Sequence, residues 1–533
     1  MEELLVTEIQ IVEALILVSV VAIVARRIRL PYTVALVLAG LAAALQTQLR
    51  LEMTPEVVLA LFLPPLVFEA AFHLQFRELR ADLGPILGQA VPGVVLSTGI
   101  VATILVYAGV LSWPQALLFG ALISATDPVA VVASFRALGA PRRLTLLMEG
   151  ESLFNDGTAI VVFTIVLGLV LRGVFSVWEG VTDFFVVSAG GLIIGFSLGY
   201  LIAQIIARID DYLIEITLTT ILAYGSYLLA EEFHVSGVLA VVAAGIVNGN
   251  LGPAGMSPTT RIVLFNFWEY VAFLANSFVF LLIGMNVDLP GLQANLQPAL
   301  IAVVAVLVAR AVTVYTVGGI ARLLGSKLSL PYLHVMVWGG LRGAVSLALA
   351  LSLPFGVGGR RELLSMTFAV VLFTLLVQAT TISGLLKRLG FTRKSELSLK
   401  YERLQGALLA VRAARRRLHR LYGEGALVPH AWRTVEQELI HREEQLVQEI
   451  DALLAANPEL AATVIHLARE EALRAQRAAL ASLAMEGLLS EEVLAELQAE
   501  VDAMLEGEYP EEAEEVAEGL EAGEEDEGEG VTG

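Results

Sequence analysis

The sequence predicts an all-α membrane protein with about thirteen transmembrane helices, followed by a helical tail outside the membrane. Apolar residues make up 56% of the 533 positions and charged residues only 17%, and the mean hydropathy is +0.74. Thirteen segments approach the ~20 apolar residues that a helix needs to cross about 30 Å of hydrocarbon. This composition is far from that of a soluble domain, so water is not the main solvent of the chain.

The predicted spans follow one another from the first apolar run, which lacks the basic start and cleavage site of a signal peptide. We expect this run to be retained as the first span. The centres of the thirteen spans lie at Leu17, Leu38, Pro64, Leu96, Ser124, Ile160, Ile193, Leu222, Ala243, Phe273, Val306, Val345 and Leu372.

Basic residues are distributed unevenly between the two sides of the predicted bundle. If the first loop is cytoplasmic, the loops on that side carry 16 arginines and lysines and the opposite loops carry four. Because these residues are enriched in cytoplasmic loops, the N-terminus is predicted outside and the C-terminus in the cytoplasm. The excess of arginine over lysine favours a GC-rich bacterial source, and hence the bacterial inner membrane.

Several ionisable side chains lie inside apolar spans, where a charge costs about 3 kcal/mol on insertion scales and is by default a functional candidate. This set consists of Glu69, Asp127, Glu149, Glu151, Asp156, Arg310 and Arg342. In the sixth span Ser152 and Asp156 are four residues apart, so they share one helix face, which Asn155 borders.

Two of the spans are predicted to be discontinuous. Pro128 donates no backbone hydrogen bond and disfavours helical geometry at Asp127, so the fifth span should break near Thr126 and free carbonyl groups that can bind a cation. The twelfth span carries three glycines within five residues around Arg342. Each motif alone could be a simple kink.

The two breaks lie seven spans apart, which fits two inverted six-helix repeats formed by spans 1 to 6 and 8 to 13. Broken helices at matching positions of two halves indicate the binding site of a secondary transporter. Asp127 and Asp156 have no obvious basic partner nearby in sequence, which favours a functional role for both. For Glu151 and Arg310 a structural ion pair is favoured over a transport role, and Arg342 could neutralise the facing ends of two half-helices.

The residues around these groups resemble a known family over positions 10–390. The motifs are PPLVFEA around Glu69, ATDPVAV around Asp127, GESLFNDGTA with Asp156, and GGLRGAVSLALAL with Arg342. They are similar to motifs of the monovalent cation/proton antiporter superfamily, specifically its NhaP-like branch, which includes the animal Na+/H+ exchangers. The resemblance implies thirteen helices in inverted repeats, a dimerisation domain, a core domain with crossed unwound helices, and a homodimer.

The resemblance also implies roles for individual residues. Asp156 looks like the carboxylate that binds Na+ or a proton, and the site is completed by Asp127, Ser152, Glu69 and the backbone of Thr126. Supporting roles fall to Asn155, which looks like the residue that positions Asp127, to the ion pair of Glu151 with Arg310, and to Arg342. Because an electrogenic branch has a second aspartate where this chain has Asn155, the implied exchange is electroneutral, one proton for one cation.

The chain ends in a region of different composition. Residues 396–506 have helical spacing of Ala, Leu, Glu and Arg, which predicts amphipathic helices following a transmembrane domain of residues 1–395. Residues 507–533 are acidic and poor in aromatic side chains, so we expect them to be disordered. The net charge of -20 arises almost entirely from residues 401–533, which hold 30 acidic and 11 basic side chains.

Three other functions remain open at this point. The first is K+/H+ exchange on the same scaffold, because small differences in cavity size and ligands separate Na+ from K+. The others are a cation channel and a membrane sensor, although the tail shows no catalytic motif. We expect no enzyme activity, no cofactor and no nucleic-acid partner, and we expect monovalent cations, protons and lipid as the ligands.

Overall fold

The computed structural model describes residues 2–28, 30–46, 57–172, 177–209, 211–252, 256, 258–326, 328–391 and 396–485, and some residues between 488 and 501. Every regular element in these residues is helical, which confirms the predicted all-α class. The chain divides after Arg393 into two compact units. The predicted disorder of residues 507–533 lies outside the described residues.

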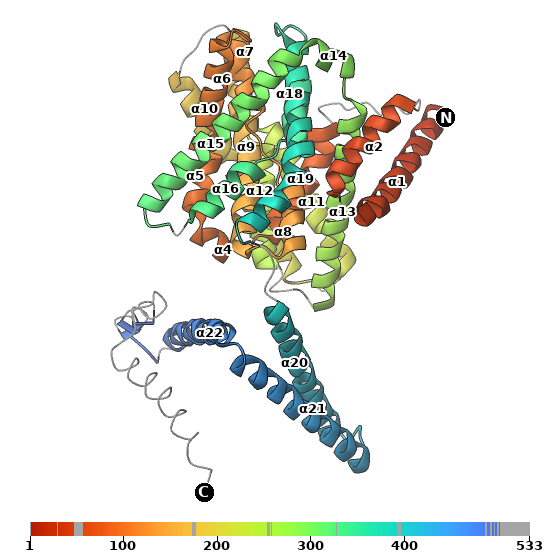
Figure 1. Cartoon of the computed structure of the whole chain (residues 1–533), viewed down its shortest axis with the longest axis vertical. Helices are drawn as coiled ribbons and strands as arrows, with labels where there is room; N and C mark the ends of the chain where they lie inside the picture. The colour runs from red at the N-terminus through yellow and green to blue at the C-terminus, as the bar shows by residue number, and fades with distance from the viewer. Residues whose placement is uncertain are drawn as a thin grey trace. The chain divides into compact units, whose positions relative to one another are not determined.

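The first unit contains the apolar helices (Figure 1). Its elements are α1 (Glu2–Ile28), α2 (Tyr32–Gln46), the π-helical turn η1 (Val57–Phe62), α3 (Leu63–His73), α4 (Phe76–Ala81), α5 (Leu83–Ala90), α6 (Pro92–Tyr107), α7 (Trp113–Leu122), α8 (Val129–Leu138), α9 (Arg142–Arg172), α10 (Val177–Ile206), α11 (Tyr212–Glu232), α12 (Gly237–Leu251), α13 (Pro258–Met285), α14 (Leu289–Ala294), α15 (Leu296–Leu323), α16 (Leu330–Gly339), α17 (Ala344–Leu351), α18 (Arg360–Phe373), the π-helical turn η3 (Thr374–Gln378) and α19 (Ala379–Arg388).

Seven helices in the described part of this unit are long and apolar enough to cross a membrane, which makes the chain a multi-pass membrane protein. They are Leu83–Tyr107, Arg142–Leu171, Trp178–Ile206, Tyr212–Glu232, Thr260–Met285, Leu296–Leu323 and Arg360–Arg388. The bent pair α16 and α17 forms an eighth candidate, and α2, α8 and α12 are shorter apolar helices. The total of thirteen crossings and the inverted repeats stay predictions.

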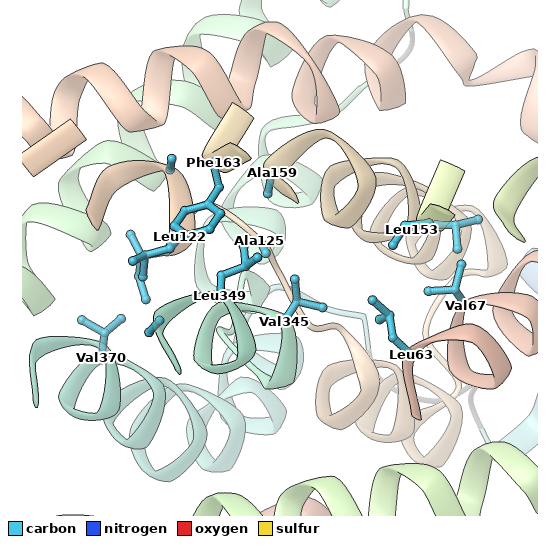
Figure 2. Packing of buried hydrophobic residues seen from close by; sticks show 14 of the residues in the cluster. Leu63, Val67, Leu122, Ala125, Leu153, Ala159, Phe163, Val345, Leu349 and Val370 are labelled. Atoms are coloured by element: carbon cyan, nitrogen blue, oxygen red, sulfur yellow. The ribbon is translucent and has the colours of Figure 1, made fainter. Parts of the chain in front are cut away.

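Packing within the unit brings distant parts of the sequence together. Helix α10 packs along α12, α2 along α13, and α3 along α12, and α1 lies beside α2 (Figure 1). Side chains of α3, α7, α9, α17 and α18 form one buried hydrophobic cluster (Figure 2). This cluster surrounds the ends of the interrupted helices, so the apolar core holds the breaks in place.

The described part of the second unit contains three long helices, α20 (Glu396–Gly423), α21 (Pro429–Ala455) and α22 (Pro458–Met485). Helices α20 and α21 pack together, and the rings of Tyr422 and Trp432 stack with centroids 4.6 Å apart. Glu443 of α21 accepts hydrogen bonds from Arg412 at 2.8 Å and from Arg415 at 2.5 Å. Aromatic and ionic contacts therefore both join the two helices.

Candidate ion-binding site

The first helix break lies between α7 and α8, where residues 124–128 are not helical. The hydroxyl of Ser124 donates to the carbonyl of Ala121 at 2.7 Å, at the end of α7. The carboxylate of Asp127 accepts from the N–H of Val129 at 3.0 Å, at the start of α8. Because Pro128 has no N–H, the break and its free backbone groups occur where the sequence predicted them.

The second break, at residues 340–343 between α16 and α17, touches the first. The two helices are bent by 41° at this point. The N–H of Asp127 donates to the carbonyl of Leu341 at 2.9 Å, so the two unwound segments are joined by a backbone hydrogen bond. A Cβ atom on Gly343 would overlap the Asp127 carboxylate, which explains why a glycine is needed at this crossing.

One face of α9 contacts the first break. The hydroxyl of Ser152 donates to the carbonyl of Thr126, and the side-chain amide of Asn155 donates to the hydroxyl of Thr126 at 3.3 Å. Asn155 therefore holds the residue before Asp127, and the predicted role of Asn155 in positioning Asp127 stays a prediction. Asp156 lies on the same helix face, one turn beyond Ser152.

These side chains line a cavity of about 120 Å³. Glu69, Thr126, Asp127, Ser152 and Asp156, the five predicted site residues, all contribute to its wall. One oxygen of Asp156, Oδ1, is buried and has no hydrogen-bond partner among the described residues. A buried carboxylate oxygen without a partner is costly unless a proton or a cation occupies it.

The donor set of the cavity is composed of oxygen. Carboxylates, a hydroxyl and a backbone carbonyl are the ligands that hard cations prefer. No three acidic, histidine or cysteine side chains in the described residues are arranged to hold a metal ion by themselves. A cation held here would therefore need the Ser152 hydroxyl, the Thr126 carbonyl or water as additional ligands.

A second cavity, of about 470 Å³, lies next to the first and is lined by His73, Glu78, Arg136 and Glu149 among others. Glu149 lines both cavities. Its carboxylate lies 3.3 Å from the guanidinium of Arg136, and the carboxylate of Glu69 lies 3.3 Å from the imidazole of His73. The two cavities thus meet at the acidic side chain of Glu149.

Three further predicted residues, Glu151, Arg310 and Arg342, support the site without lining its cavity. Arg310 is 6% exposed and Glu151 is 1% exposed. They form a two-pronged ion pair in which Nη2 and Oε2 are 2.9 Å apart. Arg310 also donates to the carbonyl of Met336 near the end of α16, at 2.9 Å and 3.2 Å. The pair therefore joins α9, α15 and α16.

Arg342 lies inside the second break and is 1% exposed. Its guanidinium donates to the carbonyl of Gly340 at 3.3 Å, and its N–H donates to the hydroxyl of Thr374 at 3.1 Å. Its charge lies beside the C-terminal end of α16, where a helix favours a cation. The contacts are those of a residue that stabilises the unwound backbone.

Sequence reasoning did not single out two uncharged polar residues that line the cavity, Asn276 and Ser346. Asn276 lies on α13, far from the other site residues in sequence, and a lone amide in an apolar helix has too many possible partners to be assigned. Ser346 follows the second break by three residues, and its hydroxyl lies 3.5 Å from the carbonyl of Ala125. Its position in the motif GGLRGAVSLALAL, just after the predicted break, could have indicated that Ser346 lies at the site. Glu149, noted as a buried acid, was not assigned to the site.

Comparisons with known proteins agree with this geometry. A protein family described as "Sodium/hydrogen exchanger, transmembrane" matches residues 14–388. The Na(+)/H(+) antiporter ApNhaP of Aphanothece halophytica is 43% identical over 365 residues, which cover 68% of this chain and 70% of that protein. The Na(+)/H(+) antiporter NhaG of Bacillus atrophaeus is 40% identical over 451 residues, which cover 83% of this chain and 84% of that protein.

The fold also matches a solved structure. The sodium proton antiporter MjNhaP1 from Methanocaldococcus jannaschii aligns with a TM-score of 0.60 at 23% sequence identity. The alignment covers 73% of this chain and 100% of that chain. At this identity the match shows that the two chains share a fold.

Proposed function

Because the chain belongs to the sodium/hydrogen exchanger family, we propose that it is a secondary transporter that exchanges Na+ or Li+ for protons across the bacterial cytoplasmic membrane. The observation that carries this proposal is the pair of acids, Asp127 and Asp156, in one cavity at the crossing of two interrupted helices. The names of its relatives support Na+ as the cation.

The exchange follows from competition for the same oxygens. A proton on Asp156 or Asp127 removes the negative charge that attracts the cation, and a bound cation makes protonation unfavourable. The ligands of the cation are Asp156, Asp127, Ser152, Glu69 and the Thr126 carbonyl. The Ser152 hydroxyl, which donates to this carbonyl, can rotate its hydrogen away, so that both oxygens face the ion. No cofactor takes part besides the transported ions.

The proposed exchange is electroneutral, one proton for each cation. Asn155 carries an amide and donates to Thr126, so it adds no titratable proton beside Asp156. In the predicted topology the cavity beside Glu149 faces the cytoplasm, so ions reach the site from the cytoplasmic side through this cavity.

We also propose that the protein is a homodimer. In this dimer the core domain of each protomer moves against a scaffold formed by the dimerisation domains.

The test is transport in proteoliposomes with an imposed proton gradient and a pH-sensitive dye inside or outside the vesicles. Na+ or Li+ should dissipate the gradient in the wild-type protein, and Asp156→Asn should reduce this signal to that of empty vesicles. Asp183→Asn is a matched control because Asp183 is an exposed residue of α10. A response to K+ in place of Na+ would establish K+/H+ exchange, and flux that neither saturates nor moves protons would establish a channel.

Competition also predicts a specific pH dependence. Each tenfold rise in proton concentration should raise the apparent KM for Na+ by up to about tenfold, because the proton occupies the ligand oxygens. The maximal rate at saturating Na+ should fall much less over the same range. An apparent KM that does not change between alkaline and acidic pH would contradict a shared site.

A further inference from the structure

A large groove lies on the surface of the transmembrane unit, away from the ion site. It has a volume of about 1100 Å³ and is lined by residues of α5, α6, α9 and α15 together with the segments next to them. Most of its wall is apolar, including Pro92 and Leu96 on one side and Val317 and Ile320 on the other. Leu96 is 38% exposed and Ile320 is 52% exposed, so the wall is open to the surroundings of the protein.

The dimensions of the groove match one leaflet of a bilayer. Its wall runs along one span from Gly84 to Leu96, and these twelve steps at ~1.5 Å each give a length of about 18 Å. Half of the hydrocarbon thickness of a bilayer is about 15 Å. The walls Leu83–Tyr107 and Leu296–Leu323 are both long enough to cross a membrane. An apolar groove on such helices excludes water and takes up a hydrocarbon chain.

One end of the groove carries two ion pairs. Arg143 contacts Asp82 at 2.6 Å, and the side chain of Asp82 is only 7% exposed. Arg142 contacts Glu78 at 3.0 Å, and these side chains are 69% and 35% exposed. The formal charges of the four residues cancel. The pair of Arg142 with Glu78 is exposed, so exchanging it for contacts to a ligand costs little.

This arrangement fits a headgroup that carries both signs of charge. A phosphate can accept from the guanidinium of Arg142, a geometry that arginine favours. A primary ammonium offers three N–H donors to the carboxylate of Glu78. A choline headgroup has no N–H to donate, and an anionic headgroup would pair its phosphate with Arg142 but leave the Glu78 carboxylate without a counter-charge.

We propose that this groove is a binding site for phosphatidylethanolamine, with an acyl chain along α5, α6 and α15 and the headgroup between Arg142 and Glu78. The site does not depend on the ion that the protein transports. It uses none of the side chains that line the ion cavity, although Glu78 and Arg142 also line the second cavity next to it.

The occupancy of the groove can be tested by blocking it. A Cβ on Gly84 would meet no atom within 4 Å, so Gly84→Leu can fill the groove without disturbing the helix packing. Gly99→Leu is the control, because Gly99 lies on the same span, outside the groove, and has equally open surroundings. The full chain is reconstituted with equal amounts of phosphatidylethanolamine, phosphatidylcholine and phosphatidylglycerol, and the retained lipid is measured by native mass spectrometry.

Wild type and Gly99→Leu should retain phosphatidylethanolamine in preference to the other two lipids, and Gly84→Leu should lose this adduct. Glu78→Gln should reduce the preference for phosphatidylethanolamine over phosphatidylcholine by about tenfold, the effect of one hydrogen bond to a charged group. Equal retention in the two glycine variants would overturn the groove as the site. A preference for phosphatidylglycerol, or a preference that Glu78→Gln leaves unchanged, would overturn the headgroup assignment.

Discussion

At the scale of single residues, the site is defined by a few oxygen atoms that the surrounding backbone cannot satisfy. Asp127 accepts from the start of α8, whereas Oδ1 of Asp156 has no partner in the described part of the chain. The two acids are therefore not equivalent. Asp156 has free capacity for a proton or cation, and Asp127 has an additional structural task at the helix break.

Ser152 offers a milder test of the site than the acids do. Ser152→Ala removes one proposed ligand and the hydrogen bond to Thr126. We expect the KM for Na+ to rise about fivefold, in line with the roughly 1 kcal/mol of one hydrogen bond, while the protein still folds. The measurement is Na+-dependent proton exchange in proteoliposomes. Ser134→Ala is the control, because its hydroxyl bonds only within α8. An unchanged KM would remove Ser152 from the site.

At the scale of elements, the ion pair of Glu151 with Arg310 joins three helices behind the site. Glu151→Gln leaves a buried arginine without a counter-charge, so we expect a loss of about 3–5 kcal/mol of stability. The melting temperature in detergent should fall clearly. Replacing both residues with leucine should recover much of the loss, because the unpaired charge is then removed.

The control for the buried ion pair is an ion pair that is exposed to solvent. Arg361 lies 3.8 Å from Asp288, and the two side chains are 82% and 50% exposed. Arg361→Ala should change the melting temperature very little, since exposed pairs contribute about 0–1 kcal/mol. If Glu151→Gln melts at the wild-type temperature, the pair does not hold the helices together.

The contact between α20 and α21 should depend on pH. The hydrogen bond from Arg412, together with the nearby charge of Arg415, lowers the pKa of the Glu443 carboxyl. A group whose pKa is lower in the folded state stabilises that state above its unfolded pKa and loses the effect as the pH falls through the folded pKa. The stabilisation by Glu443 should therefore be present at neutral pH and be lost in acid, as the pH falls below the ordinary glutamate pKa of about 4.3 and through the lowered pKa of Glu443.

Hydrogen exchange of α20 and α21 in the full chain measures this effect. At neutral pH Glu443→Gln should exchange faster than wild type, and in acid the two proteins should exchange alike. Glu438→Gln, at an exposed position of α21, should behave like wild type at both pH values. A difference between Glu443→Gln and wild type that persists in acid would contradict the assignment to this carboxylate.

At the scale of the whole molecule, the described residues separate into a membrane unit and a helical tail after Arg393. All residues that line the ion cavity belong to the first unit. We therefore expect a chain truncated after Arg393 to keep Na+-dependent proton exchange with an unchanged KM, measured in the same proteoliposome assay. Loss of exchange by truncated protein that retains the wild-type melting temperature of the membrane unit would show that the tail takes part in transport.

The sequence alone determined the class of the fold and the two helix breaks, and it named five residues that line one cavity; their binding of an ion stays a prediction. Local chemistry decides these features. Apolar segments of membrane length must be helical, Pro128 lacks the N–H that a continuous helix would need in the middle of the span, and buried acids require a function or a partner. The spacing of Ser152 and Asp156 placed both on one face of a helix before any contact was known.

Other features depend on contacts between residues that are far apart in the chain. The hydrogen bond from Asp127 to Leu341, the contribution of Asn276 to the cavity and the bond of Asn155 to Thr126 are of this kind. The groove between α5 and α15 is another. Helical periodicity shows which face of each helix is polar, but several other helices could pack against that face. Only the packing of all helices together decides which two helices come into contact.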